Sequence, residues 1–299
     1  MHEFLNIAPV VADAIRDRRP VVALESTVIA HGLPRPQNLQ TANRLQEIVR
    51  EAGAVPATIG IIGGKLTVGL SDEEIRLLAE KPDIRKISTR DLPIAVAQDL
   101  DGATTVASTL WIAHRAGIKV FATGGIGGVH RGSLPDVSAD LPELARTPIA
   151  VVCSGAKIVL DLPATREWLE THAITIVGYQ CDELPAFYSR SSGLPVDTRA
   201  DDVTAVANIF RAQRTLGLES ALVVGVPVPP KAEVPAEELQ QVLTTALEDA
   251  EWNGIVGPAL TPFLLRQMAE RSGGATLRAN IALLENNAHV AAQIARETV

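Results

Sequence analysis

The chain has 299 residues with 27 Lys and Arg against 35 Asp and Glu, which gives a formal net charge of −8. Binding to nucleic acid or to an anionic membrane by counterion release requires a basic face, so we predict neither partner and expect only a small anionic ligand held by local charges. Aromatic residues make up 3% of the chain, which argues against the stacking platforms of single-strand binders. The length is sufficient for one sizeable α/β core.

The predicted elements alternate between short apolar segments and longer amphipathic ones, as strands and helices do in an α/β protein. Strands are predicted at residues 21–27, 57–63, 85–88, 119–123, 149–153, 174–179 and 221–227, and helices at residues 37–52, 72–80, 104–116, 165–172, 201–216, 236–253, 262–272 and 277–298. Several strands are apolar throughout, so helices should cover both faces of the sheet. We therefore predict a three-layer α/β/α sandwich around a largely parallel or mixed central sheet, formed by a single domain over residues 1–299.

Cys153 and Cys181 stand in apolar segments without the spacing of a metal site. We therefore expect neither a disulfide framework nor a zinc site, and we expect a cytoplasmic protein. The first ten residues lack the basic start and long apolar block of a signal peptide, and no run reaches ~18 apolar residues. Secretion and membrane spanning are not expected.

Polar residues that end an apolar segment are the first candidates for chemistry, because ligands of open α/β sheets bind beyond the carboxyl ends of the strands. Glu25 ends the segment 21–24 and is either a general acid or a cap of the next segment. Lys157 follows the segment 149–153 after a turn of small residues. It is either an amine nucleophile held partly out of water or a lysine whose ammonium group reaches the surface.

The segment after the strand at 119–123 has five glycines within the nine residues 124–132, together with His130 and Arg131. Backbone N–H groups of such a loop can converge on an anion, and the two basic side chains add donors, so a phosphate is the natural ligand. The spacing matches neither a Walker A loop nor a dinucleotide fingerprint. Glycines that only permit a tight turn are the alternative.

Asp140 is either the N-cap of a short helix through Glu143 and Arg146 or a ligand of a hard divalent ion that is bound mainly through water. Asn280 shares a helical stripe with Leu283, Leu284 and Asn287, so an amide projects from a mostly apolar face. That amide either hydrogen-bonds a planar base or satisfies a buried carbonyl group.

Taken together, these segments resemble the pseudouridine-5′-phosphate glycosidase family, which is related to the indigoidine synthase A-like proteins. The resemblance is carried, in the order of the family, by VALEST at 22–27, GAVPAT at 53–58, RDLP at 90–93, GATTVAST at 102–109, FATGGIGGVHRG at 121–132, SADL at 138–141, VVCSGAK at 151–157 and TPFLL at 261–265. Two departures are small: Ser154 stands where an alanine is usual, and the loop between Gly132 and Asp136 looks short.

The resemblance implies an α/β/α sandwich, a homotrimer, a divalent metal ion that is usually manganese, and the reversible conversion of pseudouridine 5′-phosphate and water to uracil and ribose 5-phosphate. It also implies a role for each matching residue: Glu25 as proton donor, Lys157 as covalent nucleophile, Asp140 as metal ligand within the substrate-binding segment Ser138-Ala139-Asp140, Lys86 and Val106 as substrate-binding residues, His130 as a phosphate contact, and Thr123 and Asn280 as base contacts.

Cleavage of a carbon–carbon glycosidic bond explains why an amine is needed, since the leaving atom of the base is a carbon and must itself be protonated. We hypothesise that Glu25 protonates the ring oxygen of the ribose while Lys157 captures C1′ of the opened sugar. The nitrogen lone pair then expels uracil protonated at C5, and water hydrolyses the remaining imine.

Three other functions compete with this hypothesis. A class I aldolase-like lyase for another phosphorylated sugar would use the same lysine and phosphate loop. A noncatalytic protein that binds a phosphorylated nucleoside would need neither the acid nor the nucleophile. The indigoidine-related resemblance also raises a role in pigment biosynthesis, which no residue supports independently.

Overall fold

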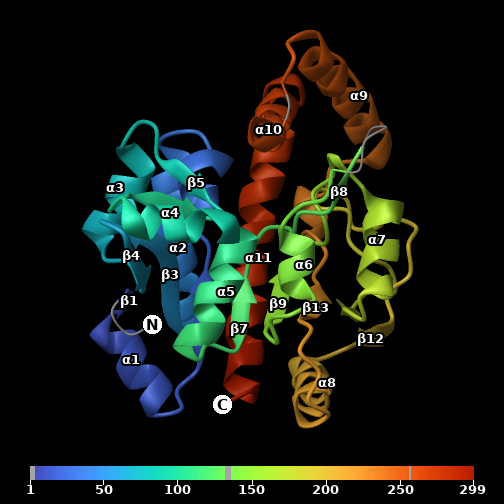
Figure 1. The fold of residues 1–299 in the computed structure, drawn as a ribbon. Helices are drawn as coiled ribbons and strands as arrows, with labels where there is room; N and C mark the ends of the chain where they lie inside the picture. The colour runs from blue at the N-terminus through green and yellow to red at the C-terminus, as the bar shows by residue number, and fades with distance from the viewer. Residues whose placement is uncertain (1–3, 132–135, 256) are drawn as a thin grey trace.

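The computed structural model describes residues 4–131, 136–255 and 257–299 (Figure 1). Its strands are β1 (Leu5–Ile7), β2 (Val21–Leu24), β3 (Val55–Ile62), β4 (Lys65–Val68), β5 (Arg85–Ile87), β6 (Gly102–Thr104), β7 (Val120–Ala122), β8 (Val129–His130), β9 (Ala150–Cys153), β10 (Leu160–Asp161), β11 (Thr175–Tyr179), β12 (Thr198–Ala200) and β13 (Leu222–Gly225). Its α-helices are α1 (Pro9–Arg16), α2 (Gln37–Glu51), α3 (Asp72–Glu80), α4 (Leu92–Ala97), α5 (Val106–Ala116), α6 (Asp140–Leu144), α7 (Leu162–Thr171), α8 (Val203–Thr215), α9 (Ala236–Trp252), α10 (Leu260–Arg271) and α11 (Ala275–Glu297).

The central sheet has eleven strands and is mostly parallel. Nine strands follow the order β1-β4-β3-β2-β7-β9-β13-β11-β12, while β6 pairs with β3 and β5 pairs with β6. A separate ribbon pairs β8 with β10 in antiparallel fashion. The central strands β2, β7, β9 and β13 are buried along their whole length, which explains their continuously apolar sequences.

Helices cover both faces of this sheet (Figure 1). The crossovers through α2 and α8 step along the sheet in one direction, and those through α6 and α7 step in the other. Because such crossovers are right-handed, the two groups lie on opposite faces. The long helix α11 packs against α2, α8, β2, β7 and β9, and α5 packs against α6 on the other face. The predicted three-layer α/β/α sandwich is confirmed.

Strand β3 brings additional segments to the functional edge of the sheet. Its first half, Val55 to Thr58, pairs in parallel with β2, and its second half runs past the end of β2 and pairs in antiparallel fashion with β4 and β6. Strands β6 and β5 therefore run back toward the end of β2. As a result, Lys86 in β5 and Val106 after β6 approach the same edge as the residues that follow the parallel strands.

Each predicted strand and helix has a counterpart in the structure, but several short elements were not predicted. They are β1, β4, β6, β8, β10, β12, α1 and α4. Strands of two to four residues are too short to display a period. A π-helix over Val28–Gly32 was also not predicted.

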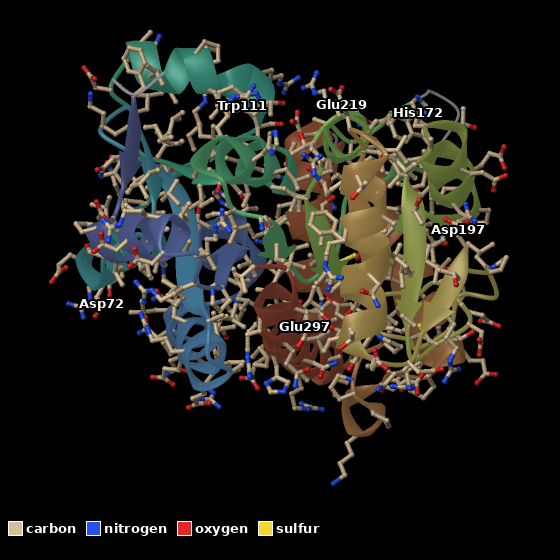
Figure 2. The ribbon with its side chains drawn as sticks, turned by 90° about the horizontal axis from the view of Figure 1, so that it is seen from below. Asp72, Trp111, His172, Asp197, Glu219 and Glu297 are labelled. Atoms are coloured by element: carbon tan, nitrogen blue, oxygen red, sulfur yellow. The ribbon has the colours of Figure 1, made fainter. Side chains whose placement is uncertain are left out.

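The remaining features concern the surface and the cysteines. Seen from below in Figure 2, charged side chains such as Asp72, Asp197 and Glu297 surround the ribbon. Cys153 is buried and Cys181 is half-buried, and both are free thiols. Within the described ranges, no helix has the length and apolar character needed to span a bilayer.

Candidate active site

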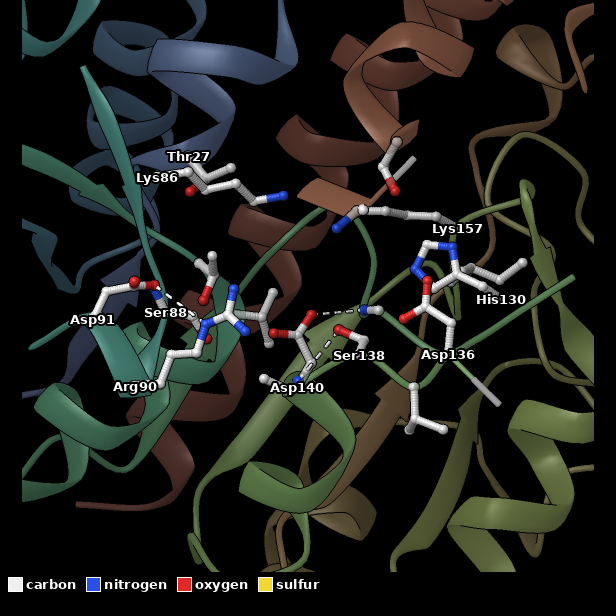
Figure 3. Close-up of a pocket in the computed structure, with 18 of the residues that line it drawn as sticks. Thr27, Lys86, Ser88, Arg90, Asp91, His130, Asp136, Ser138, Asp140 and Lys157 are labelled. Carbon is white, nitrogen blue, oxygen red and sulfur yellow. Dashed lines mark hydrogen bonds and ion pairs between the residues drawn. The ribbon is translucent and has the colours of Figure 1, made fainter. Parts of the chain in front are cut away.

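A polar cavity of about 550 Å³ lies beyond the carboxyl ends of β2, β5, β6, β7 and β9 (Figure 3). It brings together eight predicted site residues, namely Glu25, Lys86, Val106, His130, Ser138, Ala139, Asp140 and Lys157. The predicted base contacts lie beside it: Thr123 contacts Glu25, and Asn280 lines an adjoining apolar chamber. Residues that are far apart in the sequence thus form one site.

Glu25 is a buried carboxyl group at the end of β2, where it is only 8% exposed. The Thr123 hydroxyl group, at the end of β7, donates a hydrogen bond to Glu25 Oε1. Burial raises the pKa of Glu25, and the charge of Asp140 raises it further, whereas the two lysines of the cavity and the hydrogen bond from Thr123 lower it by less. A carboxyl group with a raised pKa retains its proton to higher pH than an ordinary one, which suits a general acid.

Two lysine side chains reach the cavity from opposite walls, and Figure 3 shows the amines of Lys86 and Lys157 pointing toward one another. Burial lowers the pKa of Lys86, and the charge of Lys157 lowers it further. Lys157 follows the turn after β9, where its backbone N–H donates to the Ile126 carbonyl at 3.2 Å. Its side chain lines the cavity, so the alternative of a surface lysine does not hold.

Asp140 is only 6% exposed and joins two parts of the site. Its Oδ1 accepts the backbone N–H of Ala107 at 2.9 Å, and its Oδ2 accepts that of Gly127 at 2.8 Å. The alternative that Asp140 is the N-cap of α6 is wrong, because Ala139 occupies that position. The carboxylate instead lies at the N-terminus of α5, where a negative charge is favoured by the helix dipole.

The glycine loop after β7 packs tightly against protein groups and does not leave all its amides open to an anion. Gly127 N–H is used by Asp140, Ile126 N–H donates to Gly155, and Val129 N–H donates to Thr165 Oγ1. A Cβ atom at Gly127 would lie 2.1 Å from Ser138 Oγ. These contacts support the alternative that the glycines permit a tight turn. The Arg131 side chain also has a protein partner, since its Nε donates to the Leu160 carbonyl at 3.2 Å.

Donors for an anion come instead from several walls of the polar cavity. Val106 is the first residue of α5, where a backbone N–H has no acceptor within the helix. His130, Arg85 and Arg90 line the cavity as well, and both arginines are paired with Asp91. Basic side chains therefore gather at the cavity in a chain whose net charge is −8, alongside the carboxyl groups of Glu25, Asp91, Asp136 and Asp140. The short loop predicted between Gly132 and Asp136 lies outside the described residues.

An apolar chamber adjoins the polar cavity and shares Glu25, Thr27, Lys86, Lys157 and Thr261 with it. Its other lining residues are mostly apolar and include Val28, Phe187, Leu265 and Leu284, with Asn280 and His31 as polar members. The site thus has a charged compartment and a narrow apolar one, with the acid and both amines at their boundary.

The two asparagines of the α11 stripe have different roles. Asn287 Nδ2 donates to the Thr123 carbonyl at 2.9 Å and to Ser154 Oγ at 3.1 Å, so this residue is the one that satisfies a buried carbonyl group. Asn280 is also buried and lines the apolar chamber, and its side-chain amide makes no hydrogen bond among the described residues. That amide is available to a ligand.

The carboxylates around Asp140 determine whether the cavity suits a metal ion. Within the described ranges, no three His, Cys, Asp or Glu side chains form a cluster able to enclose a metal ion. A hard divalent ion that keeps most of its water needs only one or two carboxylates. Each oxygen of Asp140 retains a free lone pair, and Asp136, which was not predicted, lines the same cavity, with no hydrogen bond to its side chain from any described residue.

Other site residues were also absent from the predictions, namely His31, Arg85, Ser88 and Thr261. Arg85 begins β5 and Ser88 follows its end, and the direction of this strand depends on the long-range pairing of β6 with β3. The local sequence does not predict the pairing of β6 with β3. His31 stands in the π-helix after β2, four residues beyond the end of the sequence block 22–27 around Glu25.

This fold and site are those of a defined family. The model of the indigoidine synthase A-like proteins matches residues 10–297, and the chain belongs to this family. The sequence is 51% identical over 298 residues to pseudouridine-5′-phosphate glycosidase of Escherichia coli K12, covering 99% of this chain and 96% of that protein. It is 49% identical over 297 residues to the protein of the same name from Caldanaerobacter subterraneus, covering 99% and 97%. The predicted resemblance, and the prediction of an enzyme, are confirmed.

Solved structures agree with these relatives. An indigoidine synthase A-like protein from Thermotoga maritima superposes with a TM-score of 0.89 at 40% identity, covering 98% of this chain and 95% of that one. A prealnumycin C-glycosynthase in complex with ribulose 5-phosphate superposes with a TM-score of 0.91 at 41% identity, covering 99% and 97%.

Proposed function

We propose that the protein reversibly cleaves the C–C glycosidic bond of pseudouridine 5′-phosphate to give uracil and ribose 5-phosphate. The observation that carries this proposal is the position of Glu25, Lys86 and Lys157 at the boundary of the polar cavity and the apolar chamber. A nucleotide changes from charged sugar phosphate to flat base at one bond, and the acid and amines lie where that bond would be. The names of the relatives and of the C-glycosynthase support the same chemistry.

The proposed first step opens the ribose ring. Glu25, whose pKa is raised by burial, protonates the ring oxygen as the C1′–O bond breaks. The amine of Lys157 forms a bond to C1′. Lys86, whose pKa is lowered by burial, is a second amine at the same place and is suited to hold or accept a proton there.

The second step breaks the carbon–carbon bond. Uracil is protonated at C5, the nitrogen lone pair forms a C=N bond to C1′, and the electron pair of the C1′–C5 bond returns to the uracil ring. Water then hydrolyses the imine, which releases ribose 5-phosphate and restores the Lys157 amine. The adduct spreads one difficult cleavage over several easier steps. In the cell this reaction would serve the catabolism of pseudouridine.

The resemblance also implies a divalent metal, most often Mn²⁺, with one ion per subunit. The residues present fit an ion held largely by water, with Asp136 and Asp140 as the carboxylates that would hold it. When bound, such an ion acts as a Lewis acid toward a phosphate, carbonyl or water oxygen. Homotrimeric assembly and a cytoplasmic location remain predictions, and light scattering measures the first.

Substrate comparison tests the proposal. The purified protein with Mn²⁺ is incubated with pseudouridine 5′-phosphate, uridine 5′-phosphate or deoxyribose 5-phosphate, and the free base and sugar phosphate are quantified. We expect uracil and ribose 5-phosphate in equal amounts from the first compound and no product from the other two. Cleavage of deoxyribose 5-phosphate would favour the aldolase, and binding of pseudouridine 5′-phosphate without product would favour a binding protein.

A further inference from the structure

His31 is a polar residue of the apolar chamber to which the mechanism assigns no role. It belongs to the π-helix Val28–Gly32, which follows β2 and begins three residues after Glu25. Short π-helical turns are rare and occur frequently at functional sites. His31 lines the chamber together with Asn280.

The Nε2 atom of His31 is buried and has no hydrogen-bond partner among the described residues. Three buried side-chain atoms in the described residues share this property, and two of them belong to residues of the site. His31 lines the apolar chamber, and Ser88 lines the polar cavity. A buried polar atom without a partner destabilises a fold, so each such atom calls for a reason. A ligand that supplies the missing partner is such a reason.

We propose that His31 is a base-binding residue whose Nε2 hydrogen-bonds the polar edge of the pyrimidine, beside the amide of Asn280. This inference rests on the proposed function and deepens it, because it assigns the apolar chamber to the base and the polar cavity to the sugar phosphate. The ligand class of the chamber is a neutral pyrimidine with an imide edge.

The chemistry of the chamber fits such a base. Apolar side chains, including Val28, Phe187 and Leu265, line a space of about 50 Å³ that can receive the edge of a flat uncharged ring, while few polar atoms orient it. Burial lowers the pKa of His31, and the charge of Lys86 lowers it further. The imidazole is therefore neutral at pH 7, and its nitrogen atoms offer one donor and one acceptor to the carbonyl and N–H groups of an imide.

The test separates binding of the base from binding of the sugar phosphate. His31→Leu removes the polar atoms at similar volume, and His31→Gln retains a polar atom near the position of Nε2. His289→Leu makes the same change at an exposed position of α11 and serves as the control. For each variant, we would measure the dissociation constants of uracil and of ribose 5-phosphate, the KM for pseudouridine 5′-phosphate, and the melting temperature.

We expect His31→Leu to weaken uracil binding and to raise the KM about tenfold, while ribose 5-phosphate binding stays within about twofold of the wild type. His31→Gln should recover most of the loss, and His289→Leu should behave as the wild type. The melting temperature of His31→Leu should not fall, because the substitution removes an unpartnered buried atom and breaks no hydrogen bond of the described fold.

Three results would overturn the inference. Uracil binding unchanged in His31→Leu would remove His31 from base recognition and leave the proposed function intact. Equal weakening of both ligands together with a lower melting temperature would assign His31 a purely structural role. A wild-type protein that neither cleaves pseudouridine 5′-phosphate nor binds uracil would overturn the proposed function, and the inference with it.

Discussion

The Thr123 hydroxyl group donates a hydrogen bond to the Glu25 carboxyl group from the neighbouring strand. The two residues meet because β2 and β7 pair in parallel with Leu24 opposite Ala122, so that Glu25 and Thr123 are the next residues beyond the paired strands. The hydrogen bond lowers the pKa of Glu25, while burial raises it by more. Thr123 therefore both orients the acid and limits how strongly it holds its proton.

Replacing Thr123 with valine should move the alkaline limb of the activity profile. Thr123→Val keeps the shape of the side chain but removes the donor that lowers the Glu25 pKa, so this pKa should rise. Since Glu25 acts in its protonated form, the limb in kcat/KM at high pH should shift to higher pH. Thr67→Val, at a buried position of β4, is the control. A limb that stays in place or moves to lower pH would contradict this role of Thr123.

Replacing Glu25 with glutamine should lower activity and raise stability at high pH. A general acid contributes roughly 100- to 10,000-fold, so kcat of Glu25→Gln should fall by about that factor with little change in substrate binding. The unfolded chain ionises Glu25 at its ordinary pKa of 4.5, whereas the folded protein retains the proton to higher pH. The wild type therefore loses stability as the pH rises through that interval.

Glu25→Gln should consequently melt above the wild type at about pH 8 and together with it at about pH 4, where both side chains are uncharged. Calorimetry at the two pH values measures this difference. A variant that melts below the wild type at the higher pH would mean that Glu25 is stabilised as a carboxylate by the lysines.

Replacing Asp140 with asparagine should destabilise the protein. The Asp140 carboxylate accepts hydrogen bonds from Ala107 and Gly127, and an amide can accept only one of them while its NH₂ group faces the other donor. The expected loss is about 1–3 kcal/mol in the free energy of unfolding, measured by urea denaturation. Asp83→Asn, at an exposed position, should stay within about 0.5 kcal/mol of the wild type. Equal stabilities of the two variants would show that these hydrogen bonds contribute little.

Metal removal should reduce turnover, and Mn²⁺ should restore it. Exhaustive chelation followed by titration with Mn²⁺ gives the concentration needed for half-maximal activity. Asp136→Asn should raise that concentration about tenfold, because loss of one carboxylate weakens a site that has few protein ligands. Asp83→Asn again serves as the control. Full activity after chelation would exclude an essential ion.

The sequence was informative where the fold follows from local pattern and incomplete where it depends on distant pairing. Glu25, Thr123 and Lys157 could be placed because they follow the ends of apolar strands and parallel strands end at one edge. The partners of Asp140 could not be predicted, since they lie at the start of α5 and in the glycine loop. His31 gave no local signal, because its buried nitrogen is defined only by side chains brought together by the fold.

The central claim is that Lys157 forms a covalent adduct with the opened sugar, and borohydride trapping tests it directly. The wild-type protein is incubated with ribose 5-phosphate and borohydride, digested, and the modified peptide is mapped by mass spectrometry. Loss of water between the Lys157 amine and the C1 aldehyde gives an imine, which the hydride reduces to a stable secondary amine. We predict one adduct, on Lys157, that disappears in Lys157→Arg. An adduct on Lys86 instead, or none in an active preparation, would contradict the account.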